Sequence, residues 1–252
     1  MTHNPTYTTD LLIRELSSDD LAARFDAASL IGIDQVTDAA DALVARLGVE
    51  TDCQVRERVT WATVRVIDAA LPGLLDALGS DEPAVRMQAA HVLSKAARPE
   101  FAEHLAPLIA DADASVAIKA YRAAANTGDP ALIPLLADRL GDGDHHQTDA
   151  LTNAFRTLGE AGVGALVAAL ASEDAGVRHH AAETLGHLGL DADAAAEALA
   201  TATQDTDAEV RLVATTALGQ LGEVADAPLA ELQASQDAVV AAVAQALVQR
   251  RG

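Results

Sequence analysis

Three histidines lie close together in the segment VRHHAAETLGHLG, where they could bind a metal ion. His179 and His180 are adjacent, and His187 follows two helical turns later. Neutral imidazoles at this spacing on a helix can converge on a transition metal. The same spacing is typical of solvated histidines on an exposed helix flank. We therefore predict no metal site here, and a small site at these histidines is left open as the alternative.

A second group of possible ligands lies in the segment Gly141-Asp-Gly-Asp-His-His146. It brings carboxylates and imidazoles together, from Asp142 to His146, but it lacks the ligand spacing of a calcium loop. A turn between two helices explains the same residues, so a metal site at this segment is also left open rather than predicted.

Cys53 is the only cysteine of the chain, which excludes an intrachain disulfide and a thiolate metal cluster. It lies at an expected helix start, where the pKa of a thiol can fall. No general base lies near it in the sequence, and we interpret it as a structural or incidental residue. The sequence predicts no catalytic residue and no cofactor.

These residues belong to a repeat that covers nearly the whole chain. Successive copies are aligned on an anchor position that follows an apolar residue in most copies, and successive anchors are 30 to 33 residues apart. The anchors are Arg24, Arg56, Arg86, Ala117, Thr148, Arg178, Arg211 and Ala241. A regular period of this length is typical of repeat proteins in which each copy is one supersecondary unit.

Each copy predicts a helix that begins at an acidic residue and ends near a glycine. The residue four before each anchor is acidic in all eight copies, and an Asp there caps a helix by accepting free backbone N–H groups. These residues are Asp20, Asp52, Glu82, Asp113, Asp144, Asp174, Asp207 and Asp237. Eleven residues after the anchor, glycine suits a left-handed residue that ends a helix. This holds for Gly128, Gly159, Gly189, Gly222 and Gly252.

Apolar residues at positions −1, +3, +6, +7 and +10 from the anchor form a stripe along one side of this helix. One copy places Val210, Ala214, Ala217, Leu218 and Leu221 there. A shorter apolar helix precedes each long one, often with an early proline, and Pro107 and Pro134 are expected to kink theirs. The predicted fold is all-α, an α-α superhelix of about eight helix pairs. Residues 1–8 are expected to be a flexible tail, and residues 9–252 a single solenoid domain.

The pattern D-x-x-V-R-x-x-A-A-x-x-L-G-x-L-G, present as Asp174–Gly189, resembles the HEAT-like repeat of the phycobilisome-lyase type. The resemblance covers roughly residues 9–252, and Asp207–Gly222 is a second nearly complete copy. It implies that the Asp and Arg side chains form hydrogen-bonded ladders between neighbouring repeats. Ala117, Thr148 and Ala241 depart from the pattern, so the ladder is expected to be interrupted there. The repeat serves many roles, so it specifies the fold more than the function.

Two classes of enzyme are built of repeats similar to those of this chain. Deoxyhypusine hydroxylase holds two irons with His-Glu pairs directly after the arginine, whereas this chain has His179-His180 there and Leu212-Val213 in the next copy. That activity is therefore not expected. Phycobilin lyases bind a bilin, and nothing in the sequence marks a tetrapyrrole pocket.

The composition indicates a folded protein with an acidic surface. The net charge is −21, from 38 acidic and 17 basic residues, yet half of the 252 residues are hydrophobic, which argues against disorder. Lys95 and Lys119 are the only lysines, and this near-absence beside many arginines resembles cytoplasmic proteins of salt-accumulating archaea. No signal-peptide pattern or apolar run of about 18 residues is present, so we expect a cytoplasmic protein without a membrane span.

Basic residues gather on one flank of the long helices, at positions +2, +5 and +9 from the anchor. This flank reverses the charge balance of the whole chain, and by analogy with related solenoids we take it as the concave face. The candidate partner-binding residues are Arg58, Trp61, Arg65, His91, Lys95, Lys119 and Arg122. An ordinary solvated helix flank is the alternative interpretation.

The sequence thus favours a non-enzymatic scaffold or adaptor that binds another protein through an acidic or helical segment. One alternative is an accessory lyase-like or metal-binding repeat protein. The other is a nucleic-acid-binding protein that uses the basic flank, which the overall negative charge makes less favourable. The partner's identity and the oligomeric state do not follow from the sequence.

Overall fold

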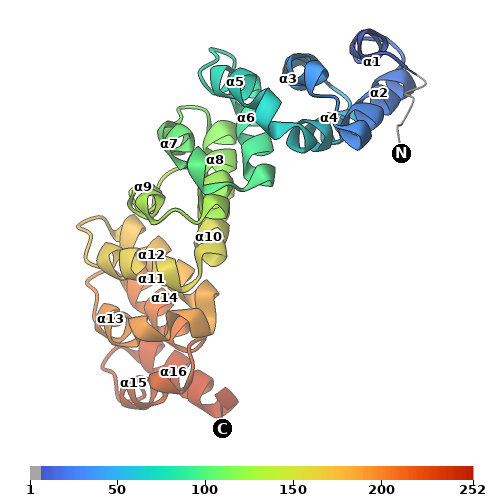
Figure 1. Ribbon diagram of the computed structural model, residues 1–252. Helices are drawn as coiled ribbons and strands as arrows, with labels where there is room; N and C mark the ends of the chain where they lie inside the picture. Colours follow the sequence, from blue (N-terminus) through green and yellow to red (C-terminus); the bar gives the residue numbers. More distant parts are fainter. Residues whose placement is uncertain (1–6, 252) are drawn as a thin grey trace. The chain divides into compact units, whose positions relative to one another are not determined.

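A computed structural model describes residues 7–251, and all regular structure in that range is helical (Figure 1). The chain separates by its contacts into two compact units, residues 1–123 and 124–252, and each is described by itself. Residues 1–6 of the predicted flexible tail, and Gly252, lie outside the described residues. That residues 9–252 form a single domain stays a prediction.

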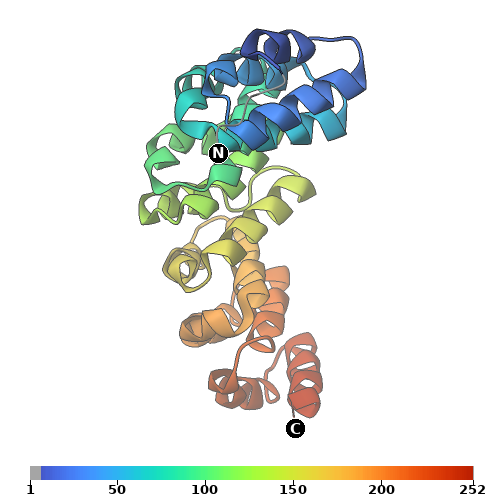
Figure 2. The ribbon, with the colours of Figure 1, turned by 45° about the vertical axis from the view of Figure 1, so that its right-hand side comes forward.

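The first unit consists of helix pairs in chain order, at the blue to green end of Figures 1 and 2. Each pair consists of a first helix and a longer second helix. The second helices α2, α4 and α6 pack successively against one another, and the first helix α3 packs against the first helix α5. The helices are α1 (Thr9–Glu15), α2 (Leu21–Asp34), α3 (Ala40–Val49), α4 (Cys53–Arg65), α5 (Ile67–Leu78), α6 (Pro83–Ala96), α7 (Ala102–Leu105) and α8 (Ala114–Thr127), with short 3-10 turns η1 (Thr37–Ala39), η2 (Pro99–Phe101) and η3 (Ala106–Ala110).

The second unit repeats the same arrangement. Its longer helices α10, α12, α14 and α16 pack successively against one another, each preceded by a shorter element. The elements are η4 (Pro130–Leu132), α9 (Ile133–Ala137), α10 (His145–Leu158), α11 (Glu160–Ala169), α12 (Ala175–Leu188), η5 (Gly189–Ala195), α13 (Ala196–Ala202), α14 (Ala208–Leu218), η6 (Glu223–Ala225), α15 (Asp226–Leu232) and α16 (Ala238–Arg251). The predicted all-α architecture of about eight helix pairs is confirmed.

Aspartate starts the long helices as the repeat predicts. All seven aspartates at the position four before the anchor accept at least one backbone N–H of the first turn, for example Asp52 from Gln54 and Val55 at 2.9 and 3.0 Å. Glu82, at the same position of α6, makes no such bond, because its side chain is one methylene longer and Pro83 follows it.

The position eleven after the anchor is left-handed in most copies, with or without glycine. Gly128, Gly159 and Gly189 have positive φ, as predicted, and so do Gln35 and Ala97 at φ 52° and 50°. Gly222 differs from the prediction, because α14 already ends at Leu218 and Gly222 has φ −71°. Its N–H instead donates to Asp193 Oδ1 at 2.7 Å.

The apolar stripe forms the core of each unit. As the helical spacing of the stripe predicts, its residues in one copy are all buried: Val210, Ala214, Ala217, Leu218 and Leu221. Small residues bring the helices into close contact, since a Cβ added to Gly186 would lie 3.1 Å from Ala217 Cα. In this part of the core, packing therefore limits the size of the side chains.

Proline shortens two of the helices that precede a long helix, α7 and α9. Pro107 lies in η3 directly after the four-residue helix α7, and Pro134 lies at the start of the five-residue helix α9. A proline lacks the N–H that a longer helix would need at these positions and clashes with the preceding turn. The expected kinks are therefore short helices joined to 3-10 turns.

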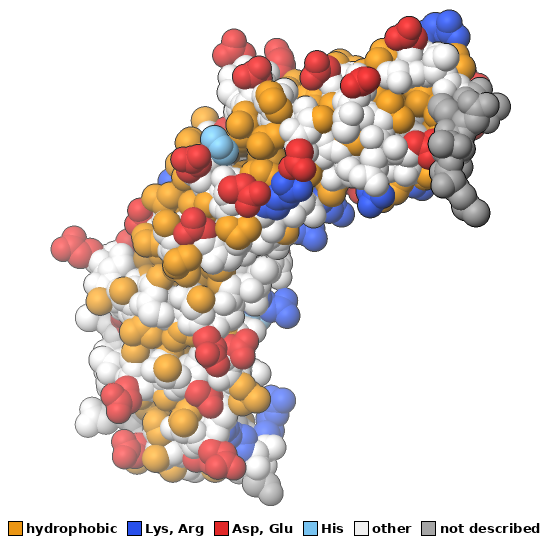
Figure 3. Space-filling model, in the orientation of Figure 1, with side chains coloured by type: hydrophobic (Ala, Val, Ile, Leu, Met, Phe, Trp, Pro, Cys, Tyr) orange, Lys and Arg blue, Asp and Glu red, His pale blue; other side chains and the backbone are white. Residues whose placement is uncertain are grey.

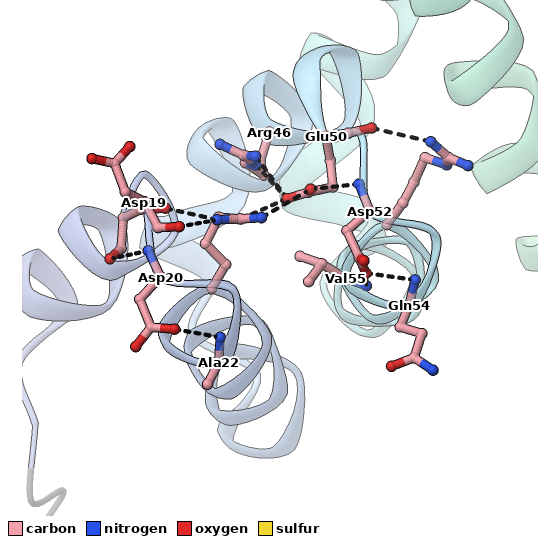
Figure 4. A network of polar contacts seen from close by, with 11 residues as sticks. Asp19, Asp20, Ala22, Arg46, Glu50, Asp52, Gln54 and Val55 are labelled. Carbon is pink, nitrogen blue, oxygen red and sulfur yellow. Dashed lines mark hydrogen bonds and ion pairs between the residues drawn. The ribbon is translucent and has the colours of Figure 1, made fainter.

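A ladder of arginines connects neighbouring copies, as the resemblance implies (Figure 4). Arg178 Nη1 donates to the carbonyls of Ser172 and Glu173 in the loop before its own helix, at 2.9 and 3.0 Å. Its Nε and Nη2 donate to Asp205 in the next copy at 2.7 and 2.8 Å, which holds the pKa of Asp205 below its usual range. Arg24, Arg86 and Arg211 make the same kinds of contact.

The carboxylate that receives the arginine is in most cases not the helix cap. Arg24, Arg86 and Arg178 bind Glu50, Asp111 and Asp205, each two residues before the capping aspartate. These carboxylates also accept the backbone N–H of the cap, for example Asp207 N–H on Asp205 at 2.8 Å. One acidic side chain thereby connects the preceding long helix to the start of the next.

No helix within residues 7–251 combines the length and apolar character needed to cross a bilayer.

Candidate functional site

The seven predicted binding residues all lie in the first unit, on three successive long helices. Arg58, Trp61 and Arg65 are on α4, His91 and Lys95 on α6, and Lys119 and Arg122 on α8. We call them the basic flank. In Figure 3, Lys and Arg side chains gather along the edge of the unit where α4 and α6 lie, while acidic side chains gather over α3 and α5. That the basic flank is concave stays a prediction.

An aromatic cluster holds Arg58. Its guanidinium carbon lies over the Phe25 ring, 4.7 Å from the centroid, and over the Trp61 ring at 5.2 Å. Both distances are typical of cation–π contacts. Phe25 belongs to α2, so this contact fastens the basic side chain to the neighbouring helix pair.

Trp61 lies against α2 at Gly32. A Cβ on Gly32 would lie 2.2 Å from Trp61 Cζ3, so the ring occupies the space that a side chain would need. Arg65, one turn further along α4, donates from Nε to the Gly32 carbonyl at 3.3 Å. Trp61 still exposes 37% of its surface and is therefore accessible to a partner.

His91 contributes a neutral side chain rather than a positive charge. Its Nε2 lies 3.2 Å from Glu57 Oε1, across α4 and α6. Burial and the positive charges of Lys119 and Lys95 lower the pKa of His91, although Glu57 acts in the opposite direction. At neutral pH the positive charge of the basic flank thus comes from its arginines and lysines.

The five Arg and Lys residues of the basic flank form no ion pair with a carboxylate among residues 7–251. By contrast, nine of the twelve other arginines of the described chain are paired with Asp or Glu, and only Arg56, Arg156 and Arg250 are not. The nine are Arg14, Arg24, Arg46, Arg86, Arg98, Arg139, Arg178, Arg211 and Arg251. Unpaired cations are notable in a chain with 38 acidic and 17 basic residues. The charge of Arg58, Arg65, Lys95, Lys119 and Arg122 is therefore available to a partner.

Sequence reasoning missed Phe25, Gly32 and Glu57, which position the basic flank. A glycine inside the helical pattern of α2 was a usable signal, since it often marks close approach of another group. Phe25 and Glu57 carried no comparable signal, because their contacts join residues 33 and 34 positions apart.

The three histidines of α12 do not converge. His180 is buried, and its two ring nitrogens contact Gly141 N–H and Thr152 Oγ1 at 3.1 and 3.0 Å. His187 instead lines an open groove of about 500 Å³ between α12 and α14, together with Glu183 and Gln220. No group of three His, Cys, Asp or Glu residues in the described part of the chain is arranged to hold a metal ion.

The turn before α10 uses its polar residues for structure. Asp142 pairs with Arg139 at 2.8 Å, Asp144 caps α10, and His145 lies 3.3 Å from Asp149. Cys53 is exposed at the first residue of α4.

Comparison with known proteins gives a consistent result. A family model described as HEAT repeats matches residues 41–117, 71–156 and 163–248. No curated protein matches the chain.

Three solved structures illustrate the similarity. A structure of Kap121p has a TM-score of 0.58 at 15% identity, over 95% of this chain and 33% of that one. The complex of CpcE and CpcF of phycocyanin lyase from Nostoc sp. PCC7120 has a TM-score of 0.45 at 25% identity, over 99% and 96% of the two chains. Human deoxyhypusine hydroxylase has a TM-score of 0.41 at 22% identity, over 96% of each.

Proposed function

Because the chain belongs to the HEAT repeat family, we propose that it is a non-enzymatic scaffold that binds an acidic segment of another protein on its basic flank. The observation that carries the proposal is a set of five cations on three neighbouring long helices that have no carboxylate partner within residues 7–251: Arg58, Arg65, Lys95, Lys119 and Arg122. An acidic segment would supply the missing partners.

The chemistry of the basic flank suits protein recognition. Arg and Trp are enriched among the residues that dominate binding energy at interfaces, and both occur here beside each other. The strongly negative charge of the rest of the chain repels an acidic partner elsewhere and favours binding in one place.

Nucleic acid is a less favourable ligand for the same surface. The net charge of −21 repels phosphate, and affinity that arises from phosphate contacts falls steeply as salt rises. Trp61 is the only tryptophan, which gives a poor platform for stacking successive bases. A filter-binding assay over a salt series separates the classes, because nucleic-acid binding collapses with salt while an interaction with an apolar anchor persists.

A non-enzymatic role is supported by the residues that follow the anchors. A HEAT-like di-iron hydroxylase needs His-Glu pairs at these positions, and this chain has His179-His180, with His180 buried and bonded inside the protein. An imidazole enclosed in this way is not available as a metal ligand.

The proposal is tested by reversing the charge of Arg58, Arg65, Lys119 and Arg122 to Glu. Capture of protein partners in molar KCl should be lost while the helical circular dichroism and the unfolding temperature stay close to those of the unaltered protein. A matched pair of double variants sharpens the test. Arg65→Glu/Arg122→Glu should weaken capture, whereas Arg14→Glu/Arg156→Glu, which changes two exposed arginines outside the flank, should not. Retention of the same partners by the reversed variant contradicts the proposal.

A further inference from the structure

The aromatic cluster of the basic flank combines a charge with an accessible apolar surface. Arg58 has no carboxylate partner among the described residues, and it lies over two aromatic rings. Trp61 is fixed against α2, because its ring fills the space above Gly32. A fixed aromatic side chain loses little conformational entropy when a partner binds.

We infer, resting on the proposed function, that the acidic segment binds with an apolar side chain against Trp61 and a neighbouring carboxylate on Arg58. Charge complementarity alone would accept any polyanion, and it weakens as the Debye length falls from ~8 Å at ~0.15 M salt to ~3 Å at ~1 M. Apolar contact with Trp61 is not screened in this way. The partner is therefore an acidic segment with interspersed apolar residues.

The test uses two synthetic peptides of equal length and net charge, one of glutamates with serines and one of glutamates with leucines. Trp61 is the only tryptophan, so its fluorescence reports contact directly. We expect the leucine peptide to shift the emission to shorter wavelength. We also expect its affinity to exceed that of the serine peptide by about tenfold or more at ~1 M KCl.

Two variants control this measurement, with binding followed by calorimetry. Trp61→Ala should lower the affinity for the leucine peptide by roughly thirtyfold, as expected for a residue that dominates binding energy, and leave the affinity for the serine peptide nearly unchanged. Gly32→Ala should have the same selective effect by displacing the ring, and the emission of the free protein should change. Equal affinities of the two peptides at ~0.15 M and at ~1 M KCl overturn the inference.

The failures of the two proposals are distinguishable. If both peptides bind equally and Arg65→Glu/Arg122→Glu abolishes the binding of both, the basic flank binds acidic segments but the proposed apolar contact with Trp61 is wrong. If neither peptide binds, both proposals are contradicted.

A second inference concerns the second unit, where an arginine of the ladder is missing. The anchor arginines Arg24, Arg86, Arg178 and Arg211 each hold the loop before their own helix through two of its carbonyls. The anchor of α10 is Thr148, whose hydroxyl reaches only His145 O at 3.0 Å. The loop before α10 therefore lacks the two hydrogen bonds that an anchor arginine donates to loop carbonyls in other copies.

His180 of α12 contacts this loop from inside the unit. Gly141 N–H donates to His180 Nδ1 at 3.1 Å, and His180 Nε2 lies 3.0 Å from Thr152 Oγ1, which contacts Thr184 Oγ1 at 3.2 Å. Because a backbone N–H only donates, Nδ1 accepts and the ring proton lies on Nε2. His180 is 3% exposed, so water cannot replace these bonds easily.

The geometry points to His180 as the replacement for the missing arginine, and to a connection that acid breaks. Protonation places a hydrogen on Nδ1, directly facing the Gly141 N–H. Gly141 lies close against the start of α12, because it has φ +80° and a Cβ there would lie 3.0 Å from Val177 N. An arginine in this role would keep its charge at all physiological pH values.

The surrounding charges set the direction of the pH effect. Burial lowers the pKa of His180, whereas Glu183, a hydrogen bond with the Thr148 backbone and Asp149 raise it. His179 lowers it, and the net result is a lower pKa. The native protein therefore binds fewer protons here than the unfolded chain, in which a histidine titrates near about 6.5. The stabilisation is complete above that pH and is lost as the pH falls below it.

The experiment compares thermal unfolding of the unaltered protein, His180→Gln and His179→Gln at pH about 7.5 and about 5. The loss of unfolding temperature on acidification should be smaller in His180→Gln and unchanged in His179→Gln. His91 in the first unit acts with the same sign but is identical in all three proteins. In the unaltered protein, Gly141 N–H should also lose protection from hydrogen exchange at the lower pH.

An NMR titration of the unaltered protein keeps the inference testable if His180→Gln fails to fold. His180 should then titrate below the range of exposed histidines. Titration of His180 at or above that range, or an undiminished acid sensitivity in His180→Gln, overturns the inference.

Discussion

Glu50 shows how the ladder makes a buried charge stable. Its side chain is inaccessible to solvent, yet it accepts from Arg24 Nε and Arg46 Nε at 2.9 and 2.8 Å and from Asp52 N–H at 2.9 Å (Figure 4). Burial alone raises the pKa of Glu50, but the bonds from Arg24, Asp52 and Arg46 outweigh it, and the net pKa is lowered. A buried carboxylate persists only with such a complete set of partners.

Glu50→Gln should lower the free energy of unfolding by about 3 kcal/mol, because it leaves two arginines without their shared carboxylate. Glu82→Gln, an exposed acid without a capping bond, is the control and should change stability little. Urea unfolding at neutral pH measures both. Because the folded pKa of Glu50 is lowered, its contribution is present above pH about 4.3 and lost as the pH falls through the folded value. The difference between Glu50→Gln and the unaltered protein should shrink accordingly, and a constant difference contradicts this account.

At the scale of the element, the position eleven after the anchor decides how a long helix ends. Its φ is positive at Gly128, Gly159 and Gly189, and also at Gln35 and Ala97, whose ψ values of 52° and 48° make them left-handed helical. Gly159 and Gly189 have ψ −134° and −124°, a combination with positive φ that essentially only glycine adopts, whereas Gln35 and Ala97 lie in the left-handed helical region that other residues enter at a cost. Ala97 carries a Cβ in a conformation that disfavours it by about 1–2 kcal/mol.

Ala97→Gly should stabilise the protein by about 0.5–1 kcal/mol, since relief of the left-handed strain exceeds the entropy that glycine adds to the unfolded chain. Gly128→Ala is the mirror experiment and should destabilise by about 1 kcal/mol. Nothing lies within 4 Å of its added Cβ, so only the backbone conformation opposes it. Both changes are read from denaturant midpoints. A loss of stability in Ala97→Gly contradicts the argument.

At the scale of the whole molecule, two properties act together: repetition and charge. Each copy buries its apolar stripe against its neighbours, so stability is built from many similar local interfaces. The net charge of −21 opposes compaction of the chain through self-repulsion. Salt screens this repulsion, whereas the ladder ion pairs are partly buried and are screened less.

The free energy of unfolding should therefore rise as KCl increases from ~0.1 M to ~1 M, where the Debye length is ~3 Å. Urea unfolding over a KCl series measures the effect. A variant with Asp26→Asn, Asp76→Asn and Glu231→Gln, all exposed acids, should show a smaller rise because it carries less negative charge. Stability that is independent of salt, or an equal rise in the variant, is inconsistent with this explanation and with adaptation to molar salt.

The sequence by itself determined the repeat, the all-α fold, the aspartate caps and the buried stripe. These features are local: a helix period, a capping side chain and a small residue act within one or two turns, so their pattern is visible along the chain. Ala97 and Gln35 show the limit of the same reasoning, since a glycine rule alone misses left-handed residues that lack glycine.

Only the tertiary structure decided which charged residues are paired and which histidine is enclosed. Arg178 and Arg58 are the same residue type on long helices, yet Arg178 binds Asp205 in the next copy, whereas Arg58 lies over Phe25 and Trp61 and pairs with no carboxylate of the described chain. His179 and His180 are adjacent, and only His180 is buried against Thr152. The partners in each case come from neighbouring copies, and contacts between residues so far apart in sequence depend on how the helices pack.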